Sequence, residues 1–233
     1  MDIKDRTVKY IMRLQELSMN ANKLNNNDKI KRFVRRPIAS LAEDEFAYYL
    51  YDVLDDKNIE IFINANINGI RPDIIIVKND IIVSIIELKV NIGFCRNIFD
   101  QYKDGKQRYK EKSQIHKRYK DFEKLKNKSI NFSDGNIVRD LKLSNNAKLN
   151  YVITSLESYT GSILNDYSDF IKRNNNYKNK VMLYLFCDKY HYGKLDDKKE
   201  LWPSKKEISE SVIKYFNTEI GLNKLIESIK KEL

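Results

Sequence analysis

Three charged residues stand within the most apolar part of the sequence. Asp73 precedes the apolar run 74–77, and Glu87 and Lys89 interrupt the end of the apolar run 81–90. Burying an unpaired carboxylate is costly, and two carboxylates that lie close together repel each other. A divalent cation removes both penalties, because Mg²⁺ and Mn²⁺ bind carboxylate oxygens. The three residues therefore predict a metal site beside a lysine that orients water and stabilises developing negative charge.

The spacing allows these side chains to share one face of a sheet. Alternate residues of a strand point to the same face, so we expect Glu87 and Lys89 on one side and Leu88 on the other. Asp73 falls opposite Glu87 if the turn between the two strands holds three residues, 79–81. A turn of two residues would place Asp73 and Glu87 on opposite faces. The sequence permits both turns.

This pattern resembles the motif of a nuclease superfamily. Pro72-Asp73, followed after a β-hairpin by Glu87-Leu88-Lys89, is similar to the PD-(D/E)XK superfamily, which has the restriction-endonuclease-like fold. The resemblance implies a core of helix, three strands, helix and strand, which matches about residues 37–156. It also implies that Asp73 and Glu87 bind Mg²⁺, that the Leu88 carbonyl completes the site, and that Lys89 assists the attacking water.

Two further contributions to the site follow from the same resemblance. Members often add an acidic residue from the helix before the sheet, and Glu43, Asp44 and Glu45 occupy that helix here. Glu45 lies nearest to the apolar stripe, so we expect it, ahead of Glu43, to face the sheet. Many members also carry a glutamine and a tyrosine or basic residue on the next helix. The candidate glutamines are Gln101, Gln107 and Gln114.

The elements that must position these residues belong to an α/β fold with a mixed sheet flanked by helices. Runs 73–77 and 81–90 are apolar without alternation, which is typical of strands covered on both faces. This argues against a simpler interpretation, in which Glu87 and Lys89 pair on an exposed strand edge. The strands are predicted, in chain order, over 59–63, 73–77, 81–90, 151–156 and 181–187.

Helical spacing predicts helices before and after the strands. One spans 7–24, and a second spans 37–54, where Pro37 and a Ser40–Glu43 capping box give starts a few residues apart. The later helices are predicted over 97–128 (bent or divided at Gly105), 162–173, 205–216 and 221–231. Residues 130–149 are turn-rich and are predicted to hold no strand.

The chain is predicted to be one nuclease domain over residues 1–233. Its core spans about 37–190, with an extra helix–strand unit, an N-terminal helix within 1–28 and C-terminal helices within 200–233 as appendages. A length of 233 residues is ample for one buried core.

Charge becomes informative through its placement. The net charge of +10 results from 43 Lys and Arg against 33 Asp and Glu, and lysine-rich codon usage alone could produce it. Basic segments nevertheless bracket the acidic cluster, as expected of a protein that attracts a polyanion around a cation site. The candidate nucleic-acid contacts are Arg32, Arg35, Arg36, Arg71, Arg96 and Gln107.

Several other classes are excluded by composition. Two cysteines and two histidines, without ligand spacing, argue against a disulfide scaffold, a zinc site or a Ser-His-Asp triad. No apolar run approaches the roughly 20 residues that cross a bilayer, and the charged N-terminus is not a signal peptide, so we expect no membrane contact and a cytoplasmic location.

We therefore expect an Mg²⁺- or Mn²⁺-dependent endonuclease that hydrolyses DNA, in a restriction or other defence role by resemblance. Double-strand cleavage would usually need a homodimer, and the C-terminal helices are candidates for the dimer interface or for sequence recognition. The alternative is a non-catalytic nucleic-acid-binding or assembly protein with the same fold. A buried acidic pair argues against that alternative, because binding alone does not need one.

Overall fold

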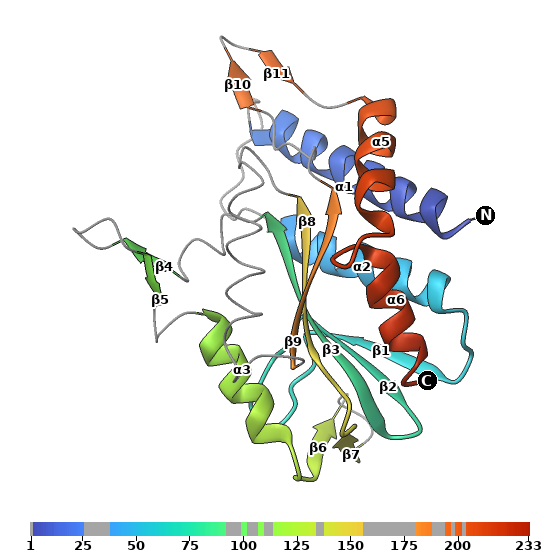
Figure 1. Cartoon of the computed structure of the whole chain (residues 1–233), viewed down its shortest axis with the longest axis vertical. Coiled ribbons are helices and arrows are strands. Elements are labelled where there is room, and N and C mark those ends of the chain that lie inside the picture. Colours follow the sequence, from blue (N-terminus) through green and yellow to red (C-terminus); the bar gives the residue numbers. More distant parts are fainter. Residues whose placement is uncertain are drawn as a thin grey trace.

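The structure is a computed structural model that describes residues 2–25, 38–91, 99–101, 107–109, 114–133, 138–155, 180–187, 194–196, 199–201 and 204–233. Within these ranges the chain has an α/β fold, in which a mixed seven-stranded sheet lies between helices (Figure 1). None of the described helices combines the length and the apolar character needed to span a membrane.

The first half of the fold is a helical pair followed by an antiparallel meander. Helix α1 (Ile3–Asn25) packs against α2 (Ile38–Leu54), and strands β1 (Ile59–Ile63), β2 (Ile74–Lys78) and β3 (Ile81–Asn91) follow. These elements confirm the predicted helices and strands to within a few residues. Because α2 begins at Ile38, Ser40 lies inside its first turn, and the start predicted from the capping box is wrong.

A crossover through α3 then brings the chain back beside β3. Helix α3 (Gln114–Leu125) precedes β8 (Leu149–Ser155), which pairs in parallel with β3 and with β9 (Val181–Cys187). Parallel strands run in the same direction, so a tight turn cannot join them and a longer crossover connection is required. Between α3 and β8, the antiparallel pair β6 (Ile130–Ser133) and β7 (Val138–Leu143) extends the sheet beside the start of β3.

Short polar strands account for the wrong predictions. The region predicted as a helix from 97 contains the hairpin β4 (Phe99–Gln101) and β5 (Gln107–Tyr109) before α3 begins. The pair β6 and β7 occupies the segment predicted to hold only turns, and β10 (Lys194–Asp196) pairs with β11 (Lys199–Leu201). Strands this short carry too little apolar alternation to be recognised. The helix predicted over 162–173 lies outside the described residues.

The two faces of the sheet are covered differently. On one face, α1, α2, α5 (Lys205–Phe216) and α6 (Leu222–Lys230) enclose a cluster that we name the α2 core. On the other face, α3 packs with β6 and β7 over the α3 core (Figure 1). The apolar stripes of α5 and α6 are buried within the chain, whereas Ile213 of α5 is 54% exposed, and a dimer interface on these helices stays a prediction.

The register of the β2–β3 hairpin is set by a short turn and a β-bulge. Its turn holds two residues, Asn79 and Asp80, with φ values of 51° and 61°, as a type I′ turn requires. Of the two turns that the sequence permits, the structure has the two-residue turn. A regular ladder from Lys78–Ile81 would have placed Asp73 and Glu87 on opposite faces.

A β-bulge restores the predicted facing. Val77 pairs with Ile82 but Ile76 pairs with Ser84, so Val83 is an extra residue on β3. Beyond the bulge the ladder continues to the pair Ile74–Ile86. The same register, continued one step beyond its last pair, would place Asp73 opposite Glu87, on the strand face that belongs to the α3 core.

The corner between α5 and α6 requires glycine for close backbone contact rather than for an unusual φ. Leu185 of β9 donates its N–H to the carbonyl of Ile220 at 2.8 Å, and a Cβ on Gly221 would lie 2.6 Å from the carbonyl carbon of Phe216. Gly221→Ala should therefore cost about 3 kcal/mol of unfolding free energy through overpacking against backbone. Urea unfolding of the two proteins measures this difference.

A second glycine supplies the control. Gly69 has φ +80° and open space around its would-be Cβ, so Gly69→Ala should cost only about 1 kcal/mol. Equal losses in the two variants would show that residue 221 can relax away from the backbone at the end of α5.

Candidate active site

Asp73 is fixed at the end of the β2–β3 ladder by its own carboxylate. Its Oδ2 accepts the backbone N–H of Leu88 at 2.8 Å, and its carbonyl accepts the N–H of Asn64 at 2.9 Å. The side chain thus continues the ladder after the backbone pairing of β2 and β3 has ended. The half-buried carboxylate is bonded to the residue next to Glu87.

Glu87 is a buried carboxylate on the α3 side of the sheet. Its side chain is only 2% exposed, and strand alternation places it on the same face as Ile85 of the α3 core. The Nε of Arg118, on α3, lies 3.2 Å from Glu87 Oε1. A cation from the crossover helix therefore compensates the charge that the sheet buries.

The space around this ion pair is small. Glu87 and Arg118 line a cavity of about 10 Å³, whose other walls are apolar and include Pro72, Ile85 and Phe122. A cavity needs about 10–15 Å³ to hold one water molecule, so this one accepts a single small occupant at most.

Sequence reasoning missed Arg118, although a signal for it exists. Arg118, Phe122 and Leu125 follow the i, i+4, i+7 spacing of one helical face, and the two apolar members are buried in the α3 core. An arginine on the apolar stripe of a basic helix indicates a buried acidic partner. The charge of α3 as a whole masked that signal, because lysines surround Arg118 in the sequence.

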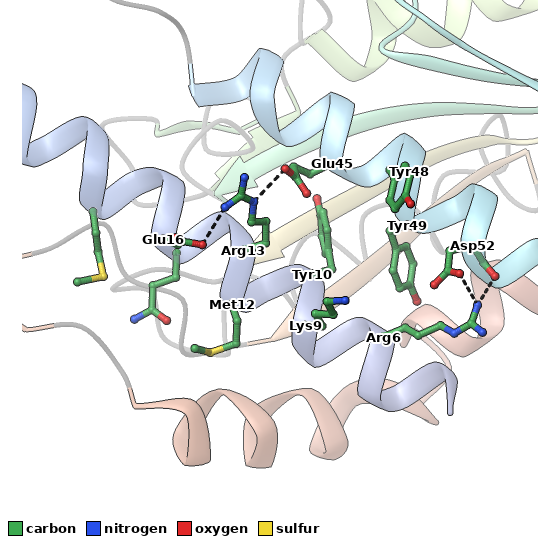
Figure 2. Close-up of a pocket in the computed structure, with 12 residues that line it drawn as sticks. Arg6, Lys9, Tyr10, Met12, Arg13, Glu16, Glu45, Tyr48, Tyr49 and Asp52 are labelled. Atoms are coloured by element: carbon green, nitrogen blue, oxygen red, sulfur yellow. Dashed lines mark hydrogen bonds and ion pairs between the residues drawn. The ribbon is translucent and has the colours of Figure 1, made fainter. Parts of the chain in front are cut away.

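Helices α1 and α2 enclose a second concavity. A pocket of about 740 Å³ lies between them and is lined partly by aromatic residues, among them Tyr48 and Tyr49 (Figure 2). Arg6 pairs with Asp52 at its edge at 2.9 Å. Neither Asp73 nor Glu87 lines this pocket, so it is separate from the predicted metal site.

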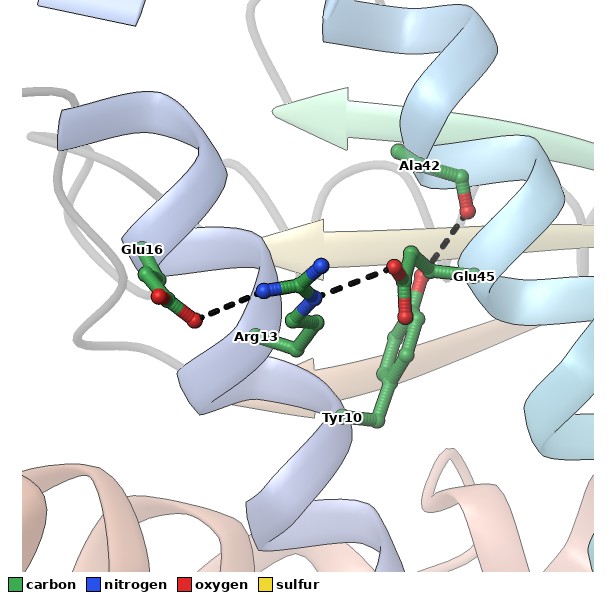
Figure 3. Close-up of polar contacts among 5 residues, drawn as sticks. All are labelled: Tyr10, Arg13, Glu16, Ala42 and Glu45. Carbon is green, nitrogen blue, oxygen red and sulfur yellow. Dashed lines mark hydrogen bonds and ion pairs between the residues drawn. The ribbon is translucent and has the colours of Figure 1, made fainter. Parts of the chain in front are cut away.

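Glu45 belongs to that pocket and faces α1. Arg13 donates from Nε to Glu45 Oε1 at 3.2 Å and from Nη1 to Glu16 at 2.9 Å (Figure 3). These two hydrogen bonds raise the pKa of Arg13 above its ordinary value. The expectation that Glu45 faces the sheet is wrong, because the part of the stripe around Tyr49 packs against Tyr10 of α1, with ring centroids 5.4 Å apart.

Glu43 is the acid of α2 that connects to Asp73. Asn64, just after β1, donates from Nδ2 to Glu43 Oε2 at 2.6 Å. The backbone N–H of the same asparagine donates to the Asp73 carbonyl. The second-ranked candidate on the helix is therefore the one that the fold links to the end of β2.

The structure describes only some of the remaining predicted site residues. Arg71 is exposed in the loop before Asp73, and the backbone of Lys89 pairs with Ile153 of β8. Several predicted contacts lie outside the described part of the chain, namely Arg32, Arg35, Arg36, Arg96 and the side chains of Lys89, Gln101, Gln107 and Gln114.

The donor set fits a divalent cation in its chemistry. Asp73 and Glu87 supply carboxylate oxygens, and the Asp73 carboxylate accepts the N–H of Leu88, the residue after Glu87. Mg²⁺ commonly takes one or two carboxylates. No group of three or more His, Cys, Asp and Glu side chains in the described ranges is arranged to hold a metal. The candidate site is therefore a two-carboxylate site, completed by backbone, water or substrate.

A scan against protein-family models finds no match to the chain, and a search of curated proteins finds no similar sequence. The functional interpretation therefore depends on the residues of the site themselves.

The role of Asp73 in the fold can be separated from any role in chemistry. Asp73→Ala removes the acceptor for the Leu88 N–H and should lower the free energy of unfolding by about 1–3 kcal/mol. Asp73→Asn keeps an oxygen acceptor of the same reach and should lose less than half as much. Urea unfolding of both variants tests this, and equal losses would mean that the hydrogen bond does not hold the end of β2.

Proposed function

We propose that the chain is a metal-dependent endonuclease that hydrolyses DNA phosphodiester bonds. The observation that carries the proposal is that the Asp73 carboxylate accepts the N–H of Leu88 at 2.8 Å, directly beside the buried Glu87. The order of α2, the β1–β2–β3 meander, α3 and parallel β8 also agrees with what the resemblance to the PD-(D/E)XK superfamily implies. A sheet that only supports binding has no need of a buried carboxylate such as Glu87.

In this proposal Asp73, Glu87 and the Leu88 carbonyl hold Mg²⁺ or Mn²⁺. When bound, such an ion lowers the pKa of water and neutralises charge on the phosphate. Lys89, two residues beyond Glu87, orients the attacking water and stabilises the charge that develops on the phosphate oxygens. The Leu88 N–H fixes the Asp73 carboxylate, so its position is set before substrate arrives.

Exposed cations beside the site provide the contacts to the nucleic-acid backbone. Lys117 and Lys120 are exposed on α3, the helix whose Arg118 reaches Glu87, and Arg71 is exposed two residues before Asp73. Lysine and arginine side chains bind phosphates with an affinity that falls as salt rises. Such contacts position the strand without reading its sequence.

The decisive experiment is cleavage of supercoiled plasmid with Mg²⁺ or Mn²⁺. Wild-type protein should nick or linearise the plasmid, and Glu87→Gln should reduce the rate by at least about 100-fold, as loss of a charged group at the reacting centre does. Gel densitometry over time measures both rates.

The matched control is Glu60→Gln. Glu60 also pairs with an arginine, Arg139 at 2.7 Å, but lies on β1. Its substitution should leave the cleavage rate unchanged. Cleavage by Glu87→Gln at the wild-type rate, or its absence in the wild-type protein, would contradict the proposal.

Substitutions of Glu43 and Glu45, the two candidate acids of α2, should have different effects on the cleavage rate. Glu43→Ala frees Asn64, which holds the Asp73 backbone, and a loosened ligand should lower kcat about tenfold. Glu45→Ala removes one of two partners of Arg13 at an exposed position and should affect the rate much less. Steady-state rates under saturating Mg²⁺ decide between them, and a larger effect of Glu45→Ala would reinstate it as the acid of the site.

One observation favours a second function, nucleic-acid binding without catalysis. Because Arg118 already compensates Glu87, the acidic residue could serve only the fold. Under this alternative the wild-type protein binds DNA without divalent ions, cleaves nothing, and binds equally well after Glu87→Gln. Fluorescence-anisotropy binding with EDTA, run beside the plasmid assay, separates the two functions.

A further inference from the structure

Two ion pairs join α1 to α2 along the wall of the large pocket between these helices. Arg6 pairs with Asp52 at 2.9 Å, and Arg13 pairs with Glu45 at 3.2 Å (Figure 2). The two arginines are seven residues apart, and so are the two acids, which places the pairs about 10 Å apart along the helices. All four side chains line the pocket, so the space between the helices is bordered by groups that hold each other in place.

The pocket has the size and the lining of a small-molecule site. Such sites occupy about 300–1,000 Å³ and are lined mainly by apolar and aromatic side chains, with a few polar groups that orient the ligand. This pocket measures about 740 Å³, and Met12, Met19 and three tyrosines contribute to its lining. Methionine side chains adapt to the shape of what they contact and interact favourably with aromatic rings.

The three tyrosines make the lining suitable for an aromatic ligand. Tyr10 and Tyr49 are buried, and their hydroxyl groups are already bonded, to the Ala42 carbonyl at 3.3 Å and to Thr7 at 2.8 Å. Tyr48 is 73% exposed, so its ring can stack against a planar ligand. The tyrosines therefore offer ring surface to an occupant of the pocket.

The charges of the lining favour an anionic ligand. Each acid of the lining has an arginine partner, since Asp52 pairs with Arg6 while Glu16 and Glu45 both pair with Arg13. Among the residues that the structure describes, Lys9 has no ion-pair or hydrogen-bond partner, although it lines the same pocket. A negatively charged group of a ligand would supply the missing partner.

We propose that the pocket between α1 and α2 binds a small aromatic molecule that carries one anionic group. The rings of the ligand stack on Tyr48 and pack against the methionines, and its anionic group pairs with Lys9. Neither Asp73 nor Glu87 lines this pocket, so the binding function is separate from the proposed nuclease activity and does not depend on it.

The test uses two fluorescent probes that differ by one sulfonate group, 8-anilinonaphthalene-1-sulfonate and the neutral N-phenyl-1-naphthylamine. Both should bind wild-type protein at one site per chain, and titration of the fluorescence gives each Kd. Lys9→Met should weaken binding of the sulfonate probe about fivefold and leave the neutral probe unchanged, because only the charge contact is lost. Tyr48→Ala should weaken both probes about fivefold, because both present aromatic rings.

Two variants outside the pocket serve as matched controls. Tyr51 is 61% exposed on the same helix as Tyr48, and Lys57 is exposed in the turn after α2, but neither lines the pocket. Tyr51→Ala and Lys57→Met should leave the Kd of both probes unchanged. All four substitutions are at exposed positions, so each variant should melt close to the wild-type temperature.

The outcomes test the site and the class of ligand separately. Weaker binding of both probes by Tyr48→Ala, with selective loss of the sulfonate probe in Lys9→Met, supports the proposal. Absence of probe binding to wild-type protein, or Kd values that Tyr48→Ala leaves unchanged, overturns the site. Equal effects of Lys9→Met on the two probes overturn the anionic class of ligand.

Discussion

A carboxylate buried in a strand that is covered on both faces constrains the whole candidate site. Glu87 is nearly inaccessible and is surrounded by the apolar residues of the α3 core, so its negative charge must have a partner. The fold supplies that partner from the crossover helix between β3 and β8. The same helix therefore serves two purposes. It connects β3 to the parallel strand β8, and it brings Arg118 to Glu87, whose charge needs a partner.

The facing of Asp73 and Glu87 depends on two local features that compensate each other. A two-residue turn alone would have put them on opposite faces, and the extra residue Val83 shifts the ladder back by one. Turn chemistry is visible in the sequence, since Asn79 and Asp80 tolerate positive φ. The bulge is not visible, because it is chosen by packing of Val83 into the α2 core. The sequence permits both turns, and the register follows from the two-residue turn together with the bulge.

The buried strands and amphipathic helices were predictable because burial dominates their composition. Strands β2 and β3 are apolar on both faces, and α5 and α6 each carry one apolar stripe. Orientation was harder, since a helical wheel identifies a buried face without identifying what covers it. Glu45 shows this: its side of α2 meets α1, and Glu43 turns toward the strand ends instead. Arg118 was hidden for the opposite reason, because a buried charge looks like its exposed neighbours in a basic sequence.

The side chain of α3 that contacts Glu87 is an arginine rather than an apolar residue, and this arrangement is of interest for function. A buried ion pair is seldom more stable than a well-packed apolar pair of the same volume, so stability alone does not explain it. Arg118 pairs with Glu87 from a helix whose Tyr119 and Phe122 are packed in the α3 core, so the position of its charge is set by that packing. The pair therefore preserves a carboxylate inside the sheet at modest cost. The proposed nuclease function would use such a carboxylate as a local site for a cation, in a chain whose net charge of +10 favours polyanions.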